Sequence, residues 1–127
     1  MTDRAAIEAL LTDLYEARCK GELEGLCALF DSETSFRIAG NSAGKAIAMS
    51  AHGMSEVRPW LALLIKSFKV TDQRILSLII DENKAAVHWQ ANILSRITGA
   101  VVSTELFDLV EVRGKRIVSY VELFLPR

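Results

Sequence analysis

The sequence contains few prolines and few cysteines. Its two prolines are Pro59 and Pro126, and it has no repeat or low-complexity tract, so nothing indicates a linker between domains. We therefore expect one domain over residues 1–127, a length that suits a single hydrophobic core. The two cysteines, Cys19 and Cys27, have no second pair and no nearby histidine. This excludes a recognisable metal-binding pattern and favours reduced, buried thiols.

The sequence also lacks an excess of charge and any long hydrophobic run. Its 15 Lys and Arg residues face 16 Asp and Glu residues, for a formal net charge of -1, so we expect neither nucleic acid nor a membrane as a partner. The N-terminal segment MTDRAAIEALLTDLYEA carries charges among its apolar positions, unlike a signal peptide, and no apolar run approaches the length of a membrane span. These absences together favour a cytoplasmic protein.

What is present is the composition of a globular protein. Hydrophobic residues make up 50% and charged residues 24% of the chain, which excludes a disordered one. There is no glycine-rich phosphate-binding loop and no Cys-x-x-Cys pair. Nucleotide hydrolysis and dithiol redox chemistry therefore have no support, and we expect no cofactor.

Apolar residues at helical spacing predict three helices. The first covers residues 3–19, and a short second one stops near Asp31. The third begins at Ser55 as its N-cap, with Pro59 in or near the first turn. The stripes are Ile7, Leu10, Leu11 and Leu14; Leu23, Leu26, Cys27 and Phe30; and Val57, Trp60, Leu61, Leu64, Ile65 and Phe68.

The remaining segments alternate with a period of two, which is typical of strands. Residues 34–39 and 45–50 read as a hairpin around a turn at 41–44. From Val70 onward, turn signals at 81–83, 98–99 and 113–115 predict a four-stranded meander. Because long strands with one apolar face need a cover, we expect an α+β fold in which three N-terminal helices pack in the concave face of a curved antiparallel sheet, around a mostly apolar pocket.

This order of elements carries a family resemblance, together with the segments GELEGLCALFDSETSFRIAG, HGMSEVRPWLALL and TELFDLVEVRGKRIVSYVELFLP. The chain resembles the nuclear-transport-factor-two-like superfamily and, more narrowly, its SnoaL-like (polyketide-cyclase-like) members. The resemblance implies a cone-shaped α+β barrel that often dimerises through its outer sheet face. The superfamily includes ketosteroid isomerases, cyclases, epoxide hydrolases, dehydratases and non-enzymatic binding modules. The resemblance therefore indicates the fold and leaves the activity open.

Matching the residues of the family narrows the chemistry. The isomerases have a tyrosine late in the first helix, where this sequence has Leu14 or, one step away, Tyr15, so the match is poor. Their general base, an aspartate in the first strand, falls at Ile38 or Arg37, neither of which abstracts a proton at neutral pH. Steroid isomerase chemistry is therefore disfavoured. The aspartate that many cyclase-like members carry in the penultimate strand matches Asp108 in LFDLVEVRGK.

Asp108 shares a strand face with Leu106 and Val110. A two-residue turn at Thr98-Gly99 would set Trp89 opposite it, and desolvation by the aromatic ring would raise its pKa, as general acid or base catalysis requires. The alternative is a structural role, in which Asp108 accepts bonds from a helix N-terminus or an arginine.

The side of the sheet to which Glu122 points depends on the turn of the last hairpin. A three-residue turn at 113–115 puts Tyr120, Glu122 and Phe124 on the Asp108 side, and a two-residue turn at 114–115 puts them on the other. The resemblance favours the first arrangement, in which the catalytic candidates Asp108 and Glu122 share one cavity; alternatively Glu122 pairs with Arg37 or another buried arginine. The expected pocket-lining residues are Phe36, Trp60, Trp89, Tyr120 and Phe124, of which the first three are primarily core residues.

Three functions remain open: a cofactor-independent cyclase, isomerase, dehydratase or hydrolase that acts on an apolar small molecule by carboxylate acid/base chemistry; a small-molecule binding protein; and a dimeric scaffold whose pocket is filled by Trp60 and Trp89. Phe107 and Leu109 are expected on the outer sheet face, among polar residues. Such an exposed apolar surface predicts a homodimer through that face.

Overall fold

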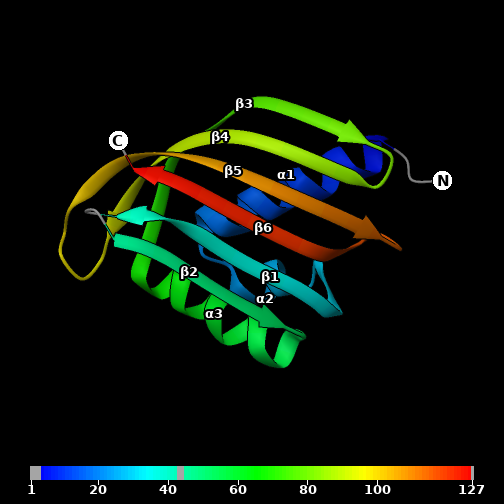
Figure 1. The fold of residues 1–127 in the computed structure, drawn as a ribbon, viewed down its shortest axis with the longest axis horizontal. Coiled ribbons are helices and arrows are strands. Elements are labelled where there is room, and N and C mark those ends of the chain that lie inside the picture. Colours follow the sequence, from blue (N-terminus) through cyan, green and yellow to red (C-terminus); the bar gives the residue numbers. More distant parts are fainter. Residues whose placement is uncertain (1–3, 43–44, 127) are drawn as a thin grey trace.

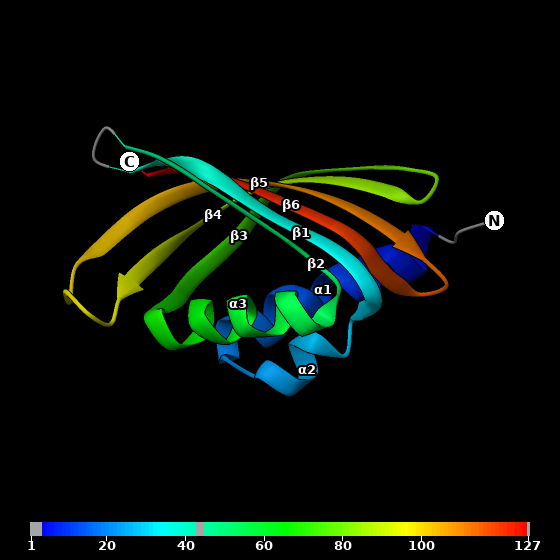
Figure 2. The same ribbon diagram turned by 60° about the horizontal axis from the view of Figure 1, so that its bottom comes forward.

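Three helices lie on one side of a curved six-stranded sheet (Figures 1 and 2). The computed structural model describes residues 4–42 and 45–126. The helices are α1 (Arg4–Lys20), α2 (Leu23–Cys27) and α3 (Met54–Ser67). The strands are β1 (Phe30–Ser42), β2 (Lys45–His52), β3 (Phe68–Asp81), β4 (Lys84–Ser95), β5 (Val101–Arg113) and β6 (Arg116–Pro126). The order of elements is the one that the sequence predicts.

The sheet has the strand order β2-β1-β6-β5-β4-β3. Strands β3 to β6 form the expected antiparallel meander, and β1 and β2 form the expected hairpin. The exception is β1, which runs parallel to β6, so the sheet is mostly rather than wholly antiparallel. The two edge strands, β2 and β3, are not neighbours, and the curved sheet stays open instead of closing into a barrel.

Helix α1 follows its apolar stripe, with Ile7, Leu11 and Leu14 buried against the sheet. Gly21, at a φ of +70°, allows the chain to leave the helix. Helix α2 is shorter than its stripe predicts, because Phe30 does not continue it. Phe30 instead begins β1, where it pairs with Ile117 of β6.

Helix α3 differs from the prediction at two positions. Its N-cap is Gly53, at a φ of +80°, rather than Ser55. The tight entry suits glycine, and the Gly53 N–H donates to the Thr34 carbonyl at 2.7 Å. Trp60, expected in the core, is 38% exposed, while Val57 and Leu61 are buried. The helix turns its Val57–Leu61 stripe inward, so Trp60, one residue before Leu61, lies at the edge of that face.

The turns of the meander determine the registers. Glu82 and Asn83 form the predicted β3–β4 turn, and the β4–β5 connection spans residues 96–100 instead of the two-residue turn considered from the sequence. The β5–β6 turn is the two-residue one, with Gly114 and Lys115 both at positive φ. None of the described helices is long and apolar enough to cross a membrane.

Candidate functional site

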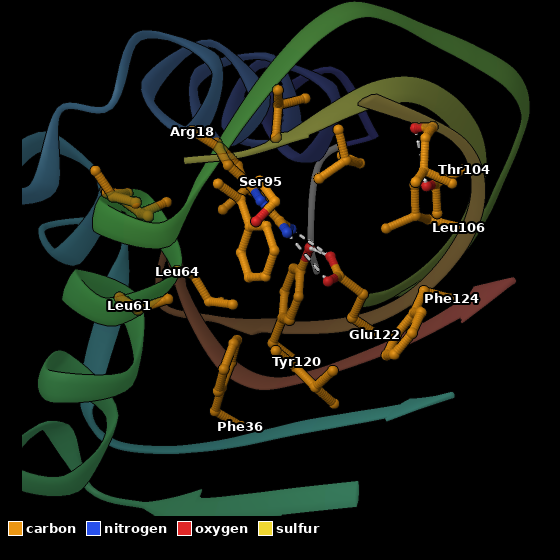
Figure 3. Close-up of a pocket in the computed structure, with 18 of the residues that line it drawn as sticks. Arg18, Phe36, Leu61, Leu64, Ser95, Thr104, Leu106, Tyr120, Glu122 and Phe124 are labelled. Atoms are coloured by element: carbon orange, nitrogen blue, oxygen red, sulfur yellow. Dashed lines mark hydrogen bonds and ion pairs between the residues drawn. The ribbon is translucent and has the colours of Figure 1, made fainter. Parts of the chain in front are cut away.

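A pocket of about 350 Å³ lies between the helices and the concave face of the sheet (Figure 3). Its wall is mostly apolar, with contributions from all three helices and from β1, β3, β4, β5 and β6. Pockets of this size hold small molecules. The residues with polar side chains in the lining are Arg18, Ser95, Thr98, Thr104, Tyr120 and Glu122.

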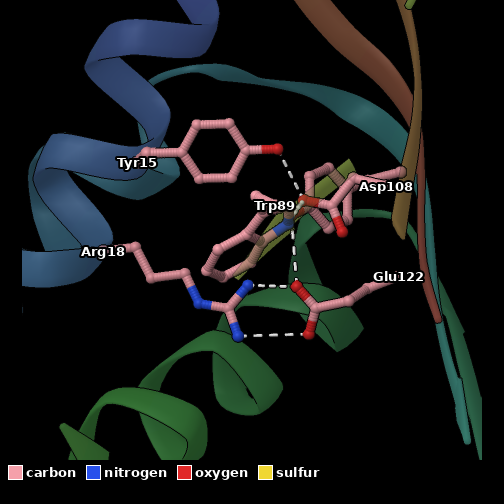
Figure 4. A network of polar contacts seen from close by, with 6 residues as sticks. Tyr15, Arg18, Trp89, Asp108 and Glu122 are labelled. Carbon is pink, nitrogen blue, oxygen red and sulfur yellow. Dashed lines mark hydrogen bonds and ion pairs between the residues drawn. The ribbon is translucent and has the colours of Figure 1, made fainter. Parts of the chain in front are cut away.

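Glu122 and Arg18 form an ion pair in the pocket wall (Figures 3 and 4). Arg18 comes from the last turns of α1 and Glu122 from β6. The guanidinium donates to both carboxylate oxygens, through Nη1 to Oε1 and through Nη2 to Oε2, the latter at 3.1 Å. The guanidinium carbon also lies 5.4 Å from the centre of the Trp89 ring. This fork-like pairing compensates the charge of a glutamate that is only 3% exposed.

Asp108 lies beside this ion pair but is not part of the pocket lining (Figure 4). Its Oδ2 atom accepts three hydrogen bonds, from the Tyr15 hydroxyl at 2.6 Å, the Trp89 indole Nε1 at 2.8 Å and the Tyr120 hydroxyl at 2.5 Å. Its Oδ1 atom is buried and has no hydrogen-bond partner among the described residues. Asp108 therefore lies behind the wall that carries Glu122.

The surroundings shift the pKa values of this cluster. Burial raises the pKa of Asp108 to about 8, and the charge of Glu122 adds to the rise, against the opposing effects of Arg18 and of the hydroxyls of Tyr120 and Tyr15. Burial and the nearby Asp108 raise the pKa of both tyrosines, so their hydroxyls stay protonated. Burial disfavours the charged form of Arg18, but the negative charge of Glu122 outweighs this effect and holds the pKa of Arg18 above its ordinary value.

A β-bulge brings the two carboxyl groups together. Arg113 pairs with Arg116 and Val112 with Ile117, but Glu111 pairs with Ser119, so β6 contains one extra residue at this point. The bulge reverses the side-chain alternation that the two-residue turn alone would impose. Asp108 and Glu122 consequently become direct cross-strand partners.

Comparison with known proteins identifies the family. The family model of the SnoaL-like domain matches residues 11–120. The chain belongs to the SnoaL-like domain family. No curated protein matches the sequence.

Solved structures share the fold of this SnoaL-like domain. A Bacillus subtilis protein provisionally named an isomerase is 15% identical, with a TM-score of 0.83 over 98% of this chain and 90% of its own. The epoxide hydrolase/cyclase-like enzyme SalBIII, which has a role in pyran ring formation in the polyether salinomycin, is 12% identical, with a TM-score of 0.78 over 98% and 95% of the two chains. An epoxide hydrolase of M. tuberculosis is 11% identical, with a TM-score of 0.70 over 92% and 80%. At these identities the likeness shows the fold alone.

Of the pocket-lining residues expected from the sequence of this SnoaL-like domain, some line the pocket and others do not. Phe36, Tyr120, Glu122 and Phe124 line the pocket. Two expected lining residues do not: Trp89 is buried beside Asp108, and Trp60 lies outside the pocket because of the rotation of α3. The residue opposite Asp108 is Val87, and Trp89 pairs with Leu106, because the β4–β5 connection is longer than two residues. The indole of Trp89 nevertheless reaches the carboxylate.

Sequence reasoning missed Arg18 and undervalued Tyr15. Both are on the inward face of α1, where Leu14 and Tyr15 follow Leu11 by three and four residues, and Arg18 follows Leu14 by four and Tyr15 by three. Extending the apolar stripe by one turn would have placed Arg18 over the pocket. Arg37, the named alternative partner of Glu122, is exposed on the other face of β1.

Residues 40–44, GNSAG, match the spacing of the G-x-S-x-G nucleophile motif. That motif requires a sharp turn from a strand into a helix. Here Gly40 and Ser42 belong to β1, which pairs with the following strand β2, and residues 43 and 44 lie outside the described residues. The strand-to-strand context does not support a serine nucleophile.

The histidines lie away from the pocket. His88 stacks on Phe107 and contacts Glu105, and His52 contacts Ser35 at the end of β2. Among residues 4–42 and 45–126, no group of three or more His, Cys, Asp or Glu side chains could hold a metal ion.

Proposed function

We propose that this SnoaL-like domain converts an apolar small molecule by proton transfer, without a cofactor, and that Glu122 is the group that meets the ligand. The observation that carries this proposal is the pairing of two buried carboxyl groups across β5 and β6, one in the pocket wall and one behind it. Two neighbouring carboxyl groups in different environments can take the roles of acid and base.

The two carboxyl groups have different roles in this proposal. Arg18 pairs with both oxygens of the Glu122 carboxylate and orients it toward the pocket. Asp108 is buried and has a raised pKa, so it retains its proton near neutral pH. Asp108 therefore acts through its neighbours as a proton store, and Glu122 exchanges the proton with the ligand. This differs from the sequence-based expectation that Asp108 itself touches the substrate.

The lining restricts the substrate class. Aromatic and aliphatic side chains surround most of the cavity, while the Arg18–Glu122 pair and the Tyr120 hydroxyl provide one strongly polar position. A compact apolar molecule with one oxygen function fits this distribution, with its oxygen near Glu122. Such molecules include cyclic epoxides, unsaturated ketones and hydroxy ketones, which are substrates for hydrolysis or cyclisation, isomerisation and dehydration respectively.

The test is turnover of these three substrate classes, followed by mass spectrometry. We expect at least one class to be converted by the wild-type protein and not by Glu122→Gln, with unchanged circular dichroism. The matched control is Glu111→Gln, which changes a half-buried carboxylate of β5 on the other face of the sheet and should leave turnover unchanged. Equal turnover by Glu122→Gln and the wild type would reject the assignment.

A second candidate, a non-catalytic binding protein, is supported by the ion pair itself. Both oxygens of Glu122 are engaged by Arg18, which lowers their availability as a base. In that case the same probes would raise the melting temperature and be recovered unchanged after incubation. The third possibility, a pocket filled by Trp60 and Trp89, does not fit the open cavity. The cytoplasmic location remains a prediction from the sequence.

A further inference from the structure

We propose that the Tyr120 hydroxyl is the proton conduit between the buried Asp108 and the pocket-facing Glu122. This deepens the proposed function by naming how the proton store reaches the ligand. Its geometry and its test are independent of any substrate.

Tyr120 stands between the two carboxyl groups. Its hydroxyl oxygen lies 2.5 Å from Asp108 Oδ2 and 3.4 Å from Glu122 Oε1. Its ring is held by stacking on Phe36, with centroids 5.5 Å apart, and by an edge contact with Phe30 at 6.0 Å. The ring is therefore fixed, and only the hydroxyl hydrogen needs to reorient. A hydroxyl can accept from one carboxyl group while it donates to another.

The other partners of Asp108 cannot make this connection. The Trp89 indole N–H only donates, so it cannot accept a proton and pass one on. The Tyr15 hydroxyl donates to Asp108, and among the described residues it has no hydrogen bond to Glu122. The charged and titratable groups facing Asp108 are Tyr15 and Arg18 from α1 and Tyr120 and Glu122 from β6. Among these four residues, Tyr120 alone is hydrogen-bonded to both carboxyl groups.

The charges of Arg18, Asp108 and Glu122 indicate that this cluster contains one mobile proton. Two carboxyl groups lie near a single guanidinium, and Arg18 donates two hydrogen bonds to Glu122. Asp108 receives only neutral donors, and burial together with the charge of Glu122 raises its pKa to about 8. A neutral cluster therefore contains the Arg18–Glu122 ion pair and a protonated Asp108.

Proton transfer through Tyr120 balances without another reactant. The O–H bond of Asp108 breaks as its proton passes to the Tyr120 oxygen, while the Tyr120 hydroxyl proton passes to Glu122 Oε1. Tyr120 ends neutral, Asp108 ends ionised, and Glu122 ends protonated and able to donate to a ligand oxygen. The negative charge that results on Asp108 is stabilised by the three donors that converge on its Oδ2 atom. Such convergence suits an anion, which explains why these donors surround a group with a raised pKa.

The test uses the Trp89 indole N–H as a reporter, because it donates to Asp108 directly. In a Trp60→Phe background, one indole resonance remains in the ¹H–¹⁵N spectrum. We expect this resonance to shift as a single averaged signal, with a midpoint near the Asp108 pKa of about 8. Asp108→Asn should abolish the shift. A Trp89 resonance that does not titrate, or that is already split in this background, would overturn the proposal.

Tyr15→Phe and Tyr120→Phe form a matched pair for the conduit itself. Each removes one hydroxyl that donates to Asp108 Oδ2, so each should raise the midpoint. The Tyr120→Phe variant alone should also give two separate resonances whose intensities exchange with pH, because proton exchange at Asp108 becomes slow. A single averaged resonance in both variants would reject the conduit. Dispersed amide spectra control for folding, and because no substrate is present, the result is separate from that of the turnover test.

Discussion

Asp108 and Glu122 are direct partners across β5 and β6, yet only Glu122 lines the pocket. The difference arises from the side chains over the two strands. Tyr15 and Trp89 cover Asp108, whereas Arg18 holds Glu122 at the cavity. Adjacent carboxyl groups therefore have different access to a ligand, and this relationship underlies the proposed function and the first two predictions.

Protonation of Asp108 should make the fold more stable at low pH. Its folded pKa of about 8 lies above the ordinary value of 3.8, so its contribution is complete below about pH 4 and is lost as the pH rises through 8. Because of Asp108, the free energy of unfolding should therefore fall by about 1.4 kcal/mol per pH unit between these two pH values. Urea unfolding from pH 4 to 9 should show that Asp108→Asn lacks this slope. The control Asp13→Asn, at an exposed position of α1, should keep it; a wild-type slope in both variants would contradict the prediction.

Removal of Arg18 should be strongly destabilising. Arg18→Met leaves Glu122 buried without its cation, which costs about 3–5 kcal/mol for pairs of this kind. Adding Glu122→Gln should recover part of that loss. Lys20→Met is the matched control, because its ion pair with Glu16 is exposed and screened by solvent, so this variant should leave the free energy of unfolding nearly unchanged. Equal effects of the two methionine variants in urea unfolding would refute this account.

Gly40 should be intolerant of a side chain. An added Cβ would lie 2.6 Å from the ring of Phe124 and 2.7 Å from its backbone oxygen, and the parallel β1–β6 pairing holds that backbone in place. Gly40→Ala should therefore cost about 1–3 kcal/mol and displace a pocket-lining ring. Gly25→Ala, whose added Cβ would make only ordinary contacts, should not destabilise the protein. The measurement is the urea-unfolding midpoint of each variant, and equal stability of Gly40→Ala and Gly25→Ala would contradict the steric argument.

The outer face of the sheet should mediate self-association. Phe107, Leu109 and Leu123 are 36%, 52% and 41% exposed on neighbouring strands, and we propose that they form a homodimer interface. Analytical ultracentrifugation at micromolar concentration should give twice the 14.1 kDa mass of one chain. Leu109→Lys should produce monomers, whereas Ile97→Lys, in the β4–β5 connection, should not. A wild-type protein that sediments as a 14.1 kDa species would exclude this interface.

Local patterns were sufficient for most of the fold. The stripe of α1 and the turn residues after β3 act over a few positions, so they predicted the elements and their order. The same patterns failed at Trp60 and Phe30. Periodicity leaves the rotation of a helix within a wide apolar face undetermined, and pairing with a distant strand can end a helix early.

The sequence by itself determined the α+β class, the family resemblance and the inward direction of Asp108, since each follows from alternation or helical spacing along the chain. Only the tertiary structure decided that Glu122 shares that side and that Arg18 neutralises it. The β6 bulge reverses strand parity in a way that turn residues do not encode, and the ion pair joins α1 to β6 across 104 positions. Contacts over such a separation depend on how the helices pack against the sheet, which no local pattern specifies.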